Sequence, residues 1–179
     1  MPDVIEQHDL HVARPREAYR VNSLYDIIRP TDAVCFDCDG VLWRGDEPIP
    51  STIALLRQLI DDGIICAFIT NSNSHSRAEI AKKLCSFGVD VVEDQVITSS
   101  FVAVNVIDKI PSHYSVLLLG AAGIRAEVEN PMFNDGIKII DADEYGEEPV
   151  DAVIVGMDRK ITYQKIDTVS RVLRNNKDC

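Results

Sequence analysis

The sequence has no apolar run as long as a membrane span, which needs about 18 to 20 residues. It is also short of positive charge, since 18 lysine and arginine residues face 29 aspartate and glutamate residues and leave a net charge of −11. Such an excess of negative charge disfavours nucleic acid and anionic membrane surfaces as partners. The N-terminus lacks the basic and then apolar pattern of a secretory signal, so we expect a cytoplasmic location.

The five cysteines form neither a zinc nor a disulfide framework. Cys35 and Cys38 make a C-x-x-C, but no second C-x-x-C and no H-x₃-H supplies the two further ligands of a zinc site. A thioredoxin-like pair would lie at a helix N-terminus, whereas this pair straddles the end of an apolar stretch. We therefore expect Cys35 and Cys66 to be buried apolar residues and Cys38 to lie beside a functional site.

What the sequence does contain is a pair of carboxylates directly after a short apolar stretch. Asp37 and Asp39 follow residues 33–36, AVCF, and side chains two residues apart in an extended chain share a face. Two such anions repel each other unless a cation lies between them or one holds a proton, so the pair predicts a catalytic or metal site. Gly40 permits a turn and a close approach of the main chain to a ligand. An ordinary strand-to-loop exit remains the alternative at this point.

A second apolar stretch, residues 64–69, runs directly into Thr70, Asn71 and Ser72. Residues 50–60, which lie between the two stretches, carry apolar side chains at helical spacing. A strand–helix–strand unit of this kind joins parallel strands, whose carboxyl ends open at one edge of the sheet, where ligands bind. We therefore predict that the Thr70, Asn71 and Ser72 donors face the aspartate pair and suit a phosphate group.

Three motifs continue this pattern: DCDGVLW at residues 37–43, GDEPIP at residues 45–50 and FITNSNSHSR at residues 68–77. Together they resemble the haloacid dehalogenase superfamily of phosphatases, in its branch of p-nitrophenylphosphatases, phosphoglycolate phosphatases and pyridoxal phosphate phosphatases. The likeness runs from about residue 33 to the end of the chain, through AVIVGMD at residues 152–158. It implies an α/β fold, with part of a Rossmann-like core (a parallel sheet flanked by helices) and part of an α/β cap domain.

The resemblance also implies roles for individual residues. Asp37 would be the nucleophile that forms an aspartyl-phosphate, and Asp39 the general acid and base. Thr70 would hold a phosphoryl oxygen, with further donors from Asn71 and Ser72 and with the Gly40 backbone close to the phosphate.

Mg²⁺ is the implied cofactor. Its implied ligands are the Asp37 carboxylate and the Asp39 backbone carbonyl, completed by waters and substrate phosphate. The metal would offset the repulsion between the two carboxylates and an anionic substrate.

The sequence departs from the family in one respect. Members also use a lysine and a further acidic metal motif after the cap, and no stretch after residue 158 matches them. Asp141 and Asp143 form another D-x-D, but by resemblance they lie in the cap, and we interpret Lys165 as a surface residue rather than a replacement. Without further core strands, the strand near residue 33 would lie at an open edge of its sheet.

We divide the chain into an N-terminal lead with one short helix (residues 1–32), the N-terminal part of the core (residues 33–110) and a partial cap (residues 111–179). The favoured function is Mg²⁺-dependent hydrolysis of a small phosphate monoester. The alternative is a truncated, weak or inactive remnant that at most binds phosphate or a partner subunit. A homodimer through the cap is compatible with either function.

Overall fold

The computed structural model describes residues 33–107, 114–130, 132–133 and 136–175. The chain divides into two compact units, Met1–Thr31 and Asp32–Cys179, and the described residues all belong to the second. The predicted N-terminal lead and the first residues of the predicted cap, 111–113, lie outside the described residues. Among the helices of the described part, none is long and apolar enough to cross a membrane.

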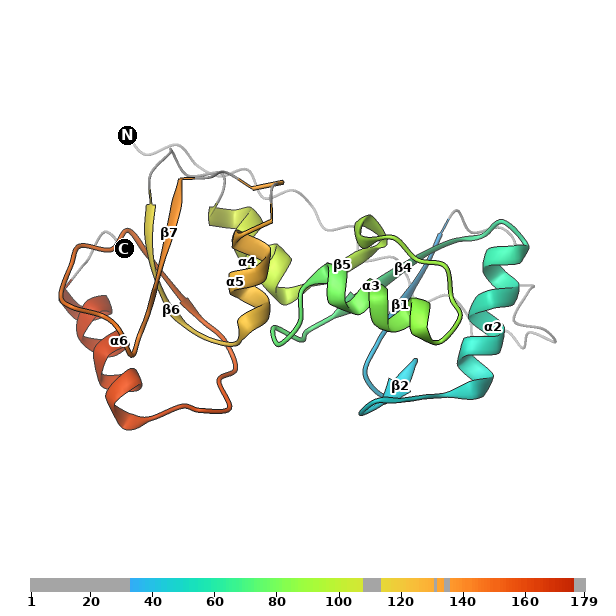
Figure 1. The fold of residues 1–179 in the computed structure, drawn as a ribbon, viewed down its shortest axis with the longest axis horizontal. Helices are drawn as coiled ribbons and strands as arrows, with labels where there is room; N and C mark the ends of the chain where they lie inside the picture. Colours follow the sequence, from blue (N-terminus) through green and yellow to red (C-terminus); the bar gives the residue numbers. More distant parts are fainter. Residues whose placement is uncertain (1–32, 108–113, 131, 134–135, 176–179) are drawn as a thin grey trace, which may run out of the picture. The chain divides into compact units, whose positions relative to one another are not determined.

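The first sheet of the described residues is parallel and three-stranded (Figure 1). It contains β1 (Ala33–Asp37), β4 (Ile65–Thr70) and β5 (Val96–Thr98) in the order β1-β4-β5. Phe36 pairs with Phe68, and Asp37 with Ile69. The predicted parallel strand–helix–strand unit is thus confirmed, and within the described residues β1 lies at the edge of the sheet.

Helices α2 and α3 are among the helices that contact this sheet, and the sequence shows why each of the two begins where it does. Helix α2 (Pro50–Asp61) has proline in its first turn, where no intrahelical N–H partner is lost. Helix α3 (Arg77–Ser86) is opened by a capping box, in which the side chains of Ser76 and Glu79 each accept from the other residue's backbone N–H. Helices α2 and α3 contact β4 and β5, respectively.

Three short elements were not predicted from the sequence. Strands β2 (Trp43–Arg44) and β3 (Glu47–Pro48) form a small antiparallel hairpin between β1 and α2. A 3₁₀ turn, η1 (Glu93–Gln95), precedes β5. These stretches are too short for hydrophobic periodicity to identify.

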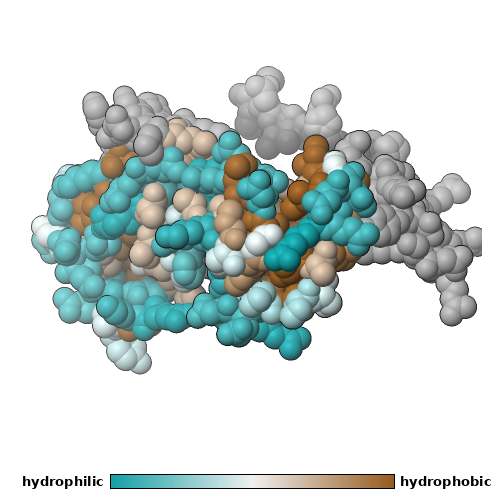
Figure 2. Space-filling model, turned by 45° about the vertical axis from the view of Figure 1, so that its right-hand side comes forward, coloured by the Kyte–Doolittle hydropathy of each residue, from teal (hydrophilic) through white to brown (hydrophobic). Residues whose placement is uncertain are grey.

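The two faces of the first sheet differ in burial. Along β4, Cys66 and Phe68 are buried, whereas Ile65 and Ile69 are 64% and 43% exposed. Cys35 lies on β1 opposite Ala67, on the open face, and is exposed. The expectation that Cys35 is buried is therefore wrong, because strand alternation points it away from the covered face, while Cys66 is buried as expected. Figure 2 shows apolar side chains reaching the surface among hydrophilic neighbours.

A second parallel sheet contains β6 (Tyr114–Leu119), β7 (Ile137–Asp141) and β8 (Ala152–Val155) in the order β7-β6-β8. Three helices flank it: α4 (Ser99–Ile107), α5 (Ala122–Val128) and α6 (Tyr163–Asn175) (Figure 1). The side chains of β6 alternate between two apolar clusters, one on each face of the sheet. The predicted α/β fold class, with parallel sheets flanked by helices, is confirmed.

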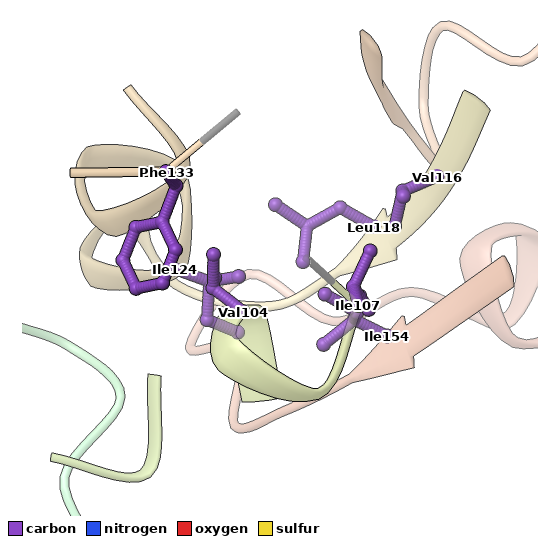
Figure 3. Close-up of a cluster of buried hydrophobic side chains, with 7 residues drawn as sticks. All are labelled: Val104, Ile107, Val116, Leu118, Ile124, Phe133 and Ile154. Carbon is purple, nitrogen blue, oxygen red and sulfur yellow. The ribbon is translucent and has the colours of Figure 1, made fainter. Parts of the chain in front are cut away.

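The cluster on the α4–α5 face forms a continuous core (Figure 3). Val104 and Ile107 of α4 and Ile124 of α5 pack there with Val116 and Leu118 of β6. Helix α4 thus follows a strand of the first sheet but packs on the second sheet. The predicted domain boundary between residues 110 and 111 falls outside the described residues and stays a prediction.

We expect Leu118→Ala to lower the free energy of unfolding by about 2–5 kcal/mol, because it removes buried methyl groups and leaves a cavity. Leu118 is 3% exposed in the centre of this core. Urea unfolding followed by circular dichroism measures the effect. Leu173→Ala on α6 is the matched control, since Leu173 is 48% exposed. Equal losses for the two variants would contradict the assignment of this core.

Candidate active site

The loop after β1 is a tight turn that presents two carboxylates. The Cys38 carbonyl accepts from the backbone N–H groups of Leu42 (2.8 Å) and Trp43 (3.3 Å), and Gly40 N donates to the Trp43 carbonyl at 2.7 Å. Gly40 has φ +81°, a conformation that side-chain-bearing residues rarely adopt. Asp37 and Asp39 flank this turn's buried Cys38 and are themselves exposed.

The Asp39 carboxylate is held by two donors from different parts of the chain. Trp43 Nε1 donates to Oδ1 at 2.9 Å, and Thr70 Oγ1 donates to Oδ2 at 3.3 Å. Trp43 and Thr70 are 2% and 3% exposed, so both donors are fixed by packing. The parallel strands thus bring Asp39 and Thr70 together at one sheet edge, as expected. The part of the chain that is described supplies no hydrogen bond to the Asp37 carboxylate.

The loop after β4 is shaped by its own hydroxyl groups. Thr70 Oγ1 accepts from Ser72 N at 3.1 Å, and Ser72 Oγ accepts from Ser74 N at 3.3 Å. Ser99 Oγ donates to the carbonyls of Asn71 and Ser72, both at 3.0 Å. Thr70 is therefore engaged with Asp39 and the loop backbone, while the Asn71 side chain remains exposed.

A cavity of about 710 Å³ opens beside these groups. Asp39, Asn71 and Ser72 of the predicted site line it, whereas Asp37, Gly40 and Thr70 do not. The other lining residues are Trp43, Gly45, Asp46, Asn73, Ser74, His75, Ile80, Lys83, Met157 and Arg159. The cavity therefore offers both carboxylate and cationic side chains to a ligand.

A buried ion pair anchors the end of the donor loop. Glu127, which is 0% exposed, accepts from Arg77 N at 2.6 Å and from Arg77 Nε at 3.1 Å. Arg77, which is 2% exposed, also pairs with Glu93 at 2.9 Å and lies 3.9 Å from the Phe101 ring centroid. Removing one partner of such a pair commonly costs about 3–5 kcal/mol. These contacts make Arg77 an anchor of the loop rather than a phosphate ligand.

Close backbone packing supports the same loop. A Cβ atom added to Gly123, at the start of α5, would lie 2.6 Å from the Asn73 carbonyl oxygen. Only glycine fits there, so the loop and α5 are matched in shape.

Cys38 is unsuited to redox or thiolate chemistry. Burial, followed by the neighbouring charges of Asp37 and Asp39, raises the pKa of its thiol to about 12, against a smaller opposing effect of Lys83. The four described cysteines are free thiols. Cys38 thus lies next to the site, as expected, without taking part in acid–base chemistry.

The residues present fit part of a Mg²⁺ coordination shell. Asp37 and Asp39 offer only oxygen donors, and both are exposed, so a bound ion could keep the waters that Mg²⁺ retains. No group of three potential metal-binding side chains occurs within the described ranges. Waters and substrate oxygens would therefore have to complete the shell.

Both aspartates of the second D-x-D, residues 141 and 143, form ion pairs with basic side chains. Asp141 pairs with Arg125 at 2.5 Å, and Asp143 with Lys165 at 3.0 Å. Lys165 also donates to Asp158 at 2.6 Å, and its side chain is 12% exposed. The expectation that Lys165 is a surface residue is therefore wrong, because two carboxylates hold it against the carboxyl edge of the second sheet.

Comparison with known proteins decides the family. The sequence model of the family of haloacid dehalogenase-like hydrolases matches residues 34–134 of this chain. The chain belongs to the haloacid dehalogenase-like hydrolases. This confirms the resemblance drawn from the motifs.

The relatives of this haloacid dehalogenase-like chain are named after different substrates. It is 33% identical to phosphoglycolate phosphatase 1A of Arabidopsis thaliana, over 86% of this chain and 46% of that protein. It is 34% identical to the 5′-nucleotidase YutF of Bacillus subtilis, over 78% of this chain and 50% of that protein. The solved p-nitrophenyl phosphatase of Archaeoglobus fulgidus matches with a TM-score of 0.68 and 25% identity, over 80% and 51%. The chain thus spans about half the length of the curated relatives it matches.

Sequence reasoning missed four residues that shape the site. Trp43 lies in the DCDGVLW motif but was given no role, although the only tryptophan of the chain, next to the aspartate pair, is a signal that could have been used. Lys83 lies outside the motifs. Glu127 is 50 residues from Arg77, and Arg159 follows β8, so no local pattern connects them to the loop.

We expect Lys165→Met to destabilise the protein most between about pH 5 and 10. Hydrogen bonding to Lys165 lowers the pKa of Asp158, and hydrogen bonding to Asp158, then Asp143, raises the pKa of Lys165. The stability that comes from charged Asp158 is therefore lost as the pH falls through the lowered pKa of Asp158. The stability that comes from charged Lys165 is lost as the pH rises through the raised pKa of Lys165.

Urea unfolding of wild type and variant at pH 3, 7 and 9 measures this dependence. Lys82→Met is the control, because Lys82 is exposed on α3. A stability difference between wild type and Lys165→Met that is as large at pH 3 as at pH 7 would refute the role of the ion pairs.

Proposed function

We propose that the site hydrolyses small phosphate monoesters through an aspartyl-phosphate on Asp37. The observation that supports this proposal is the Asp39 carboxylate, held by Trp43 and Thr70 at a cavity that also contains the Asn71 and Ser72 donors. Asp37 lies two residues away with a carboxylate that no described side chain engages. One held and one free carboxylate suit an acid–base group beside a nucleophile.

In the first step, an Asp37 oxygen attacks phosphorus and the bond to the ester oxygen breaks. Protonated Asp39 gives its proton to that leaving oxygen, so the alcohol departs neutral. In the second step, Asp39 takes a proton from water, the water oxygen bonds to phosphorus, and the acyl-phosphate bond breaks. Phosphate leaves, Asp37 is again a carboxylate and Asp39 is again protonated.

Other groups of the chain bind and orient the substrate in this proposal. The Asn71 and Ser72 donors hold phosphoryl oxygens, and Thr70 does so by turning its single hydroxyl proton from Asp39 to a phosphoryl oxygen. The Gly40 backbone allows the phosphate to approach the turn. The Asp37 carboxylate and the Asp39 carbonyl would hold Mg²⁺, which would supply positive charge to offset the repulsion between carboxylates and phosphate.

We expect hydrolysis of p-nitrophenyl phosphate that requires Mg²⁺ and falls at least about 10³-fold in Asp37→Asn, because that variant lacks the nucleophile. Asp39→Asn should lose about 10²–10⁴-fold, the usual contribution of a general acid or base. Steady-state p-nitrophenolate release measures both variants, and circular dichroism checks that each is folded.

A folded wild-type chain whose rate equals that of Asp37→Asn would refute hydrolysis by this chain. Calorimetric titration with inorganic phosphate then tests the alternative of a binding remnant. Saturable binding that Asn71→Ala weakens would support that second candidate.

Arg159 suggests a substrate with a second anionic group. It is exposed, lines the cavity, and has no acidic partner among the described side chains. We expect Arg159→Met to raise KM for phosphoglycolate about 2–5-fold, the value of an exposed ion pair, and to leave KM for p-nitrophenyl phosphate unchanged. Lys160→Met, an exposed neighbour, is the control. Equal changes in KM for both esters would contradict this specificity.

A further inference from the structure

Trp43 combines deep burial with a hydrogen bond to a carboxylate that is exposed. It is the only tryptophan of the chain, is 2% exposed, and donates from Nε1 to Asp39 Oδ1 at 2.9 Å. A buried indole N–H needs an acceptor, and this one is satisfied by a carboxylate of the proposed site. Breaking the contact would strand the donor, so packing of the ring and placement of Asp39 are coupled.

The indole ring is fixed from several directions. The backbone N–H of Trp43 donates to the Cys38 carbonyl, and the Trp43 carbonyl accepts from Gly40 N. These two hydrogen bonds close the turn that leads from Asp39 to Trp43. Its ring lies 6.1 Å from that of Phe87, at an interplanar angle of 55°. The ring therefore has little freedom to follow Asp39 if the carboxylate moves.

Lys83 of α3 connects the ring to the rest of the fold. Its Nζ lies 4.7 Å from the Trp43 ring centroid and donates to the Gly45 carbonyl at 2.7 Å. It also pairs with Asp46 at 3.4 Å. A cation over the ring draws electron density from the indole and makes its N–H a better donor. Helix α3 thus holds both the β2–β3 hairpin and the ring that it carries.

We infer that Trp43 is a positioning residue, which aims the Asp39 carboxylate at the substrate and is itself held in place by Lys83. The catalytic consequence rests on the proposed function. An indole N–H donates but cannot accept, whereas the Thr70 hydroxyl can do both. Oδ1 therefore remains the acceptor for Trp43, and Oδ2, beside Thr70, is the oxygen that is left to face the leaving group in the proposed reaction.

Nuclear magnetic resonance tests the contact without any need for activity. A single tryptophan gives one indole N–H cross-peak in a ¹⁵N-labelled chain. We expect Asp39→Ala to shift this peak and to speed its exchange with solvent by about tenfold or more, the value of a hydrogen bond to a charged group. Asp37→Ala is the matched control and should do neither. An unchanged peak in Asp39→Ala, or equal changes in both variants, would overturn the inference.

The dependence of kcat/KM on the leaving group of the ester tests whether Trp43 places Asp39 for proton transfer. p-Nitrophenolate leaves with little need for a proton, whereas the alkoxide of glycerol 2-phosphate needs one. We expect Trp43→Phe to lower kcat/KM for glycerol 2-phosphate by about 10–100-fold, which is part of a general acid's usual contribution. The same variant should lower kcat/KM for p-nitrophenyl phosphate by less than about threefold. Phe87→Leu, which loosens the ring but keeps the N–H donor, should leave the ratio of the two values unchanged.

The outcomes separate this inference from the proposed function. Equal losses for both esters in Trp43→Phe would show a purely structural role and overturn the positioning inference. No Mg²⁺- and Asp37-dependent turnover of either ester by wild type would refute the proposed function. In that case the response of the indole peak to Asp39→Ala still decides whether Trp43 positions Asp39.

Discussion

The parallel pairing of β1 with β4 is the constraint on which the site depends. It aligns Phe36 with Phe68, so both strands end at one edge of the sheet and Thr70 reaches Asp39. A parallel pair needs a crossover connection, and α2 provides it between the strands. Asp39 and Thr70 are 31 residues apart in sequence, and without that pairing they would not be neighbours in space.

A second constraint is the desolvated charge at Arg77. Its guanidinium and backbone N–H both reach Glu127, and both residues are almost fully buried. Charges removed from water need full pairing, so neither can move without stranding the other. The donor loop that ends at Arg77 is therefore held by α5, and Gly123 gives the loop room beside that helix.

The open face of the first sheet is a physical feature of the described chain. Parallel sheets are usually covered on both faces, yet Ile65 and Ile69 are largely exposed and β1 lies at an edge. The chain covers about half the length of the relatives it matches. The predicted open edge near residue 33 agrees with the strand order, and it bears on solubility because exposed apolar edges favour aggregation.

Local chemistry let the sequence alone predict the family and the strand–helix–strand unit, which are confirmed, and the residues of the proposed site, which stay a prediction. Periodicity, capping signals and the D-x-D-G and T-N-S motifs depend on near neighbours, which a sequence displays directly. Only the tertiary structure decided that Cys35 is exposed, that Lys165 is held by Asp143 and Asp158, and that Trp43 donates to Asp39. Those outcomes depend on which face of a sheet is covered and on contacts across many residues, because burial and pairing are set by packing rather than by local spacing.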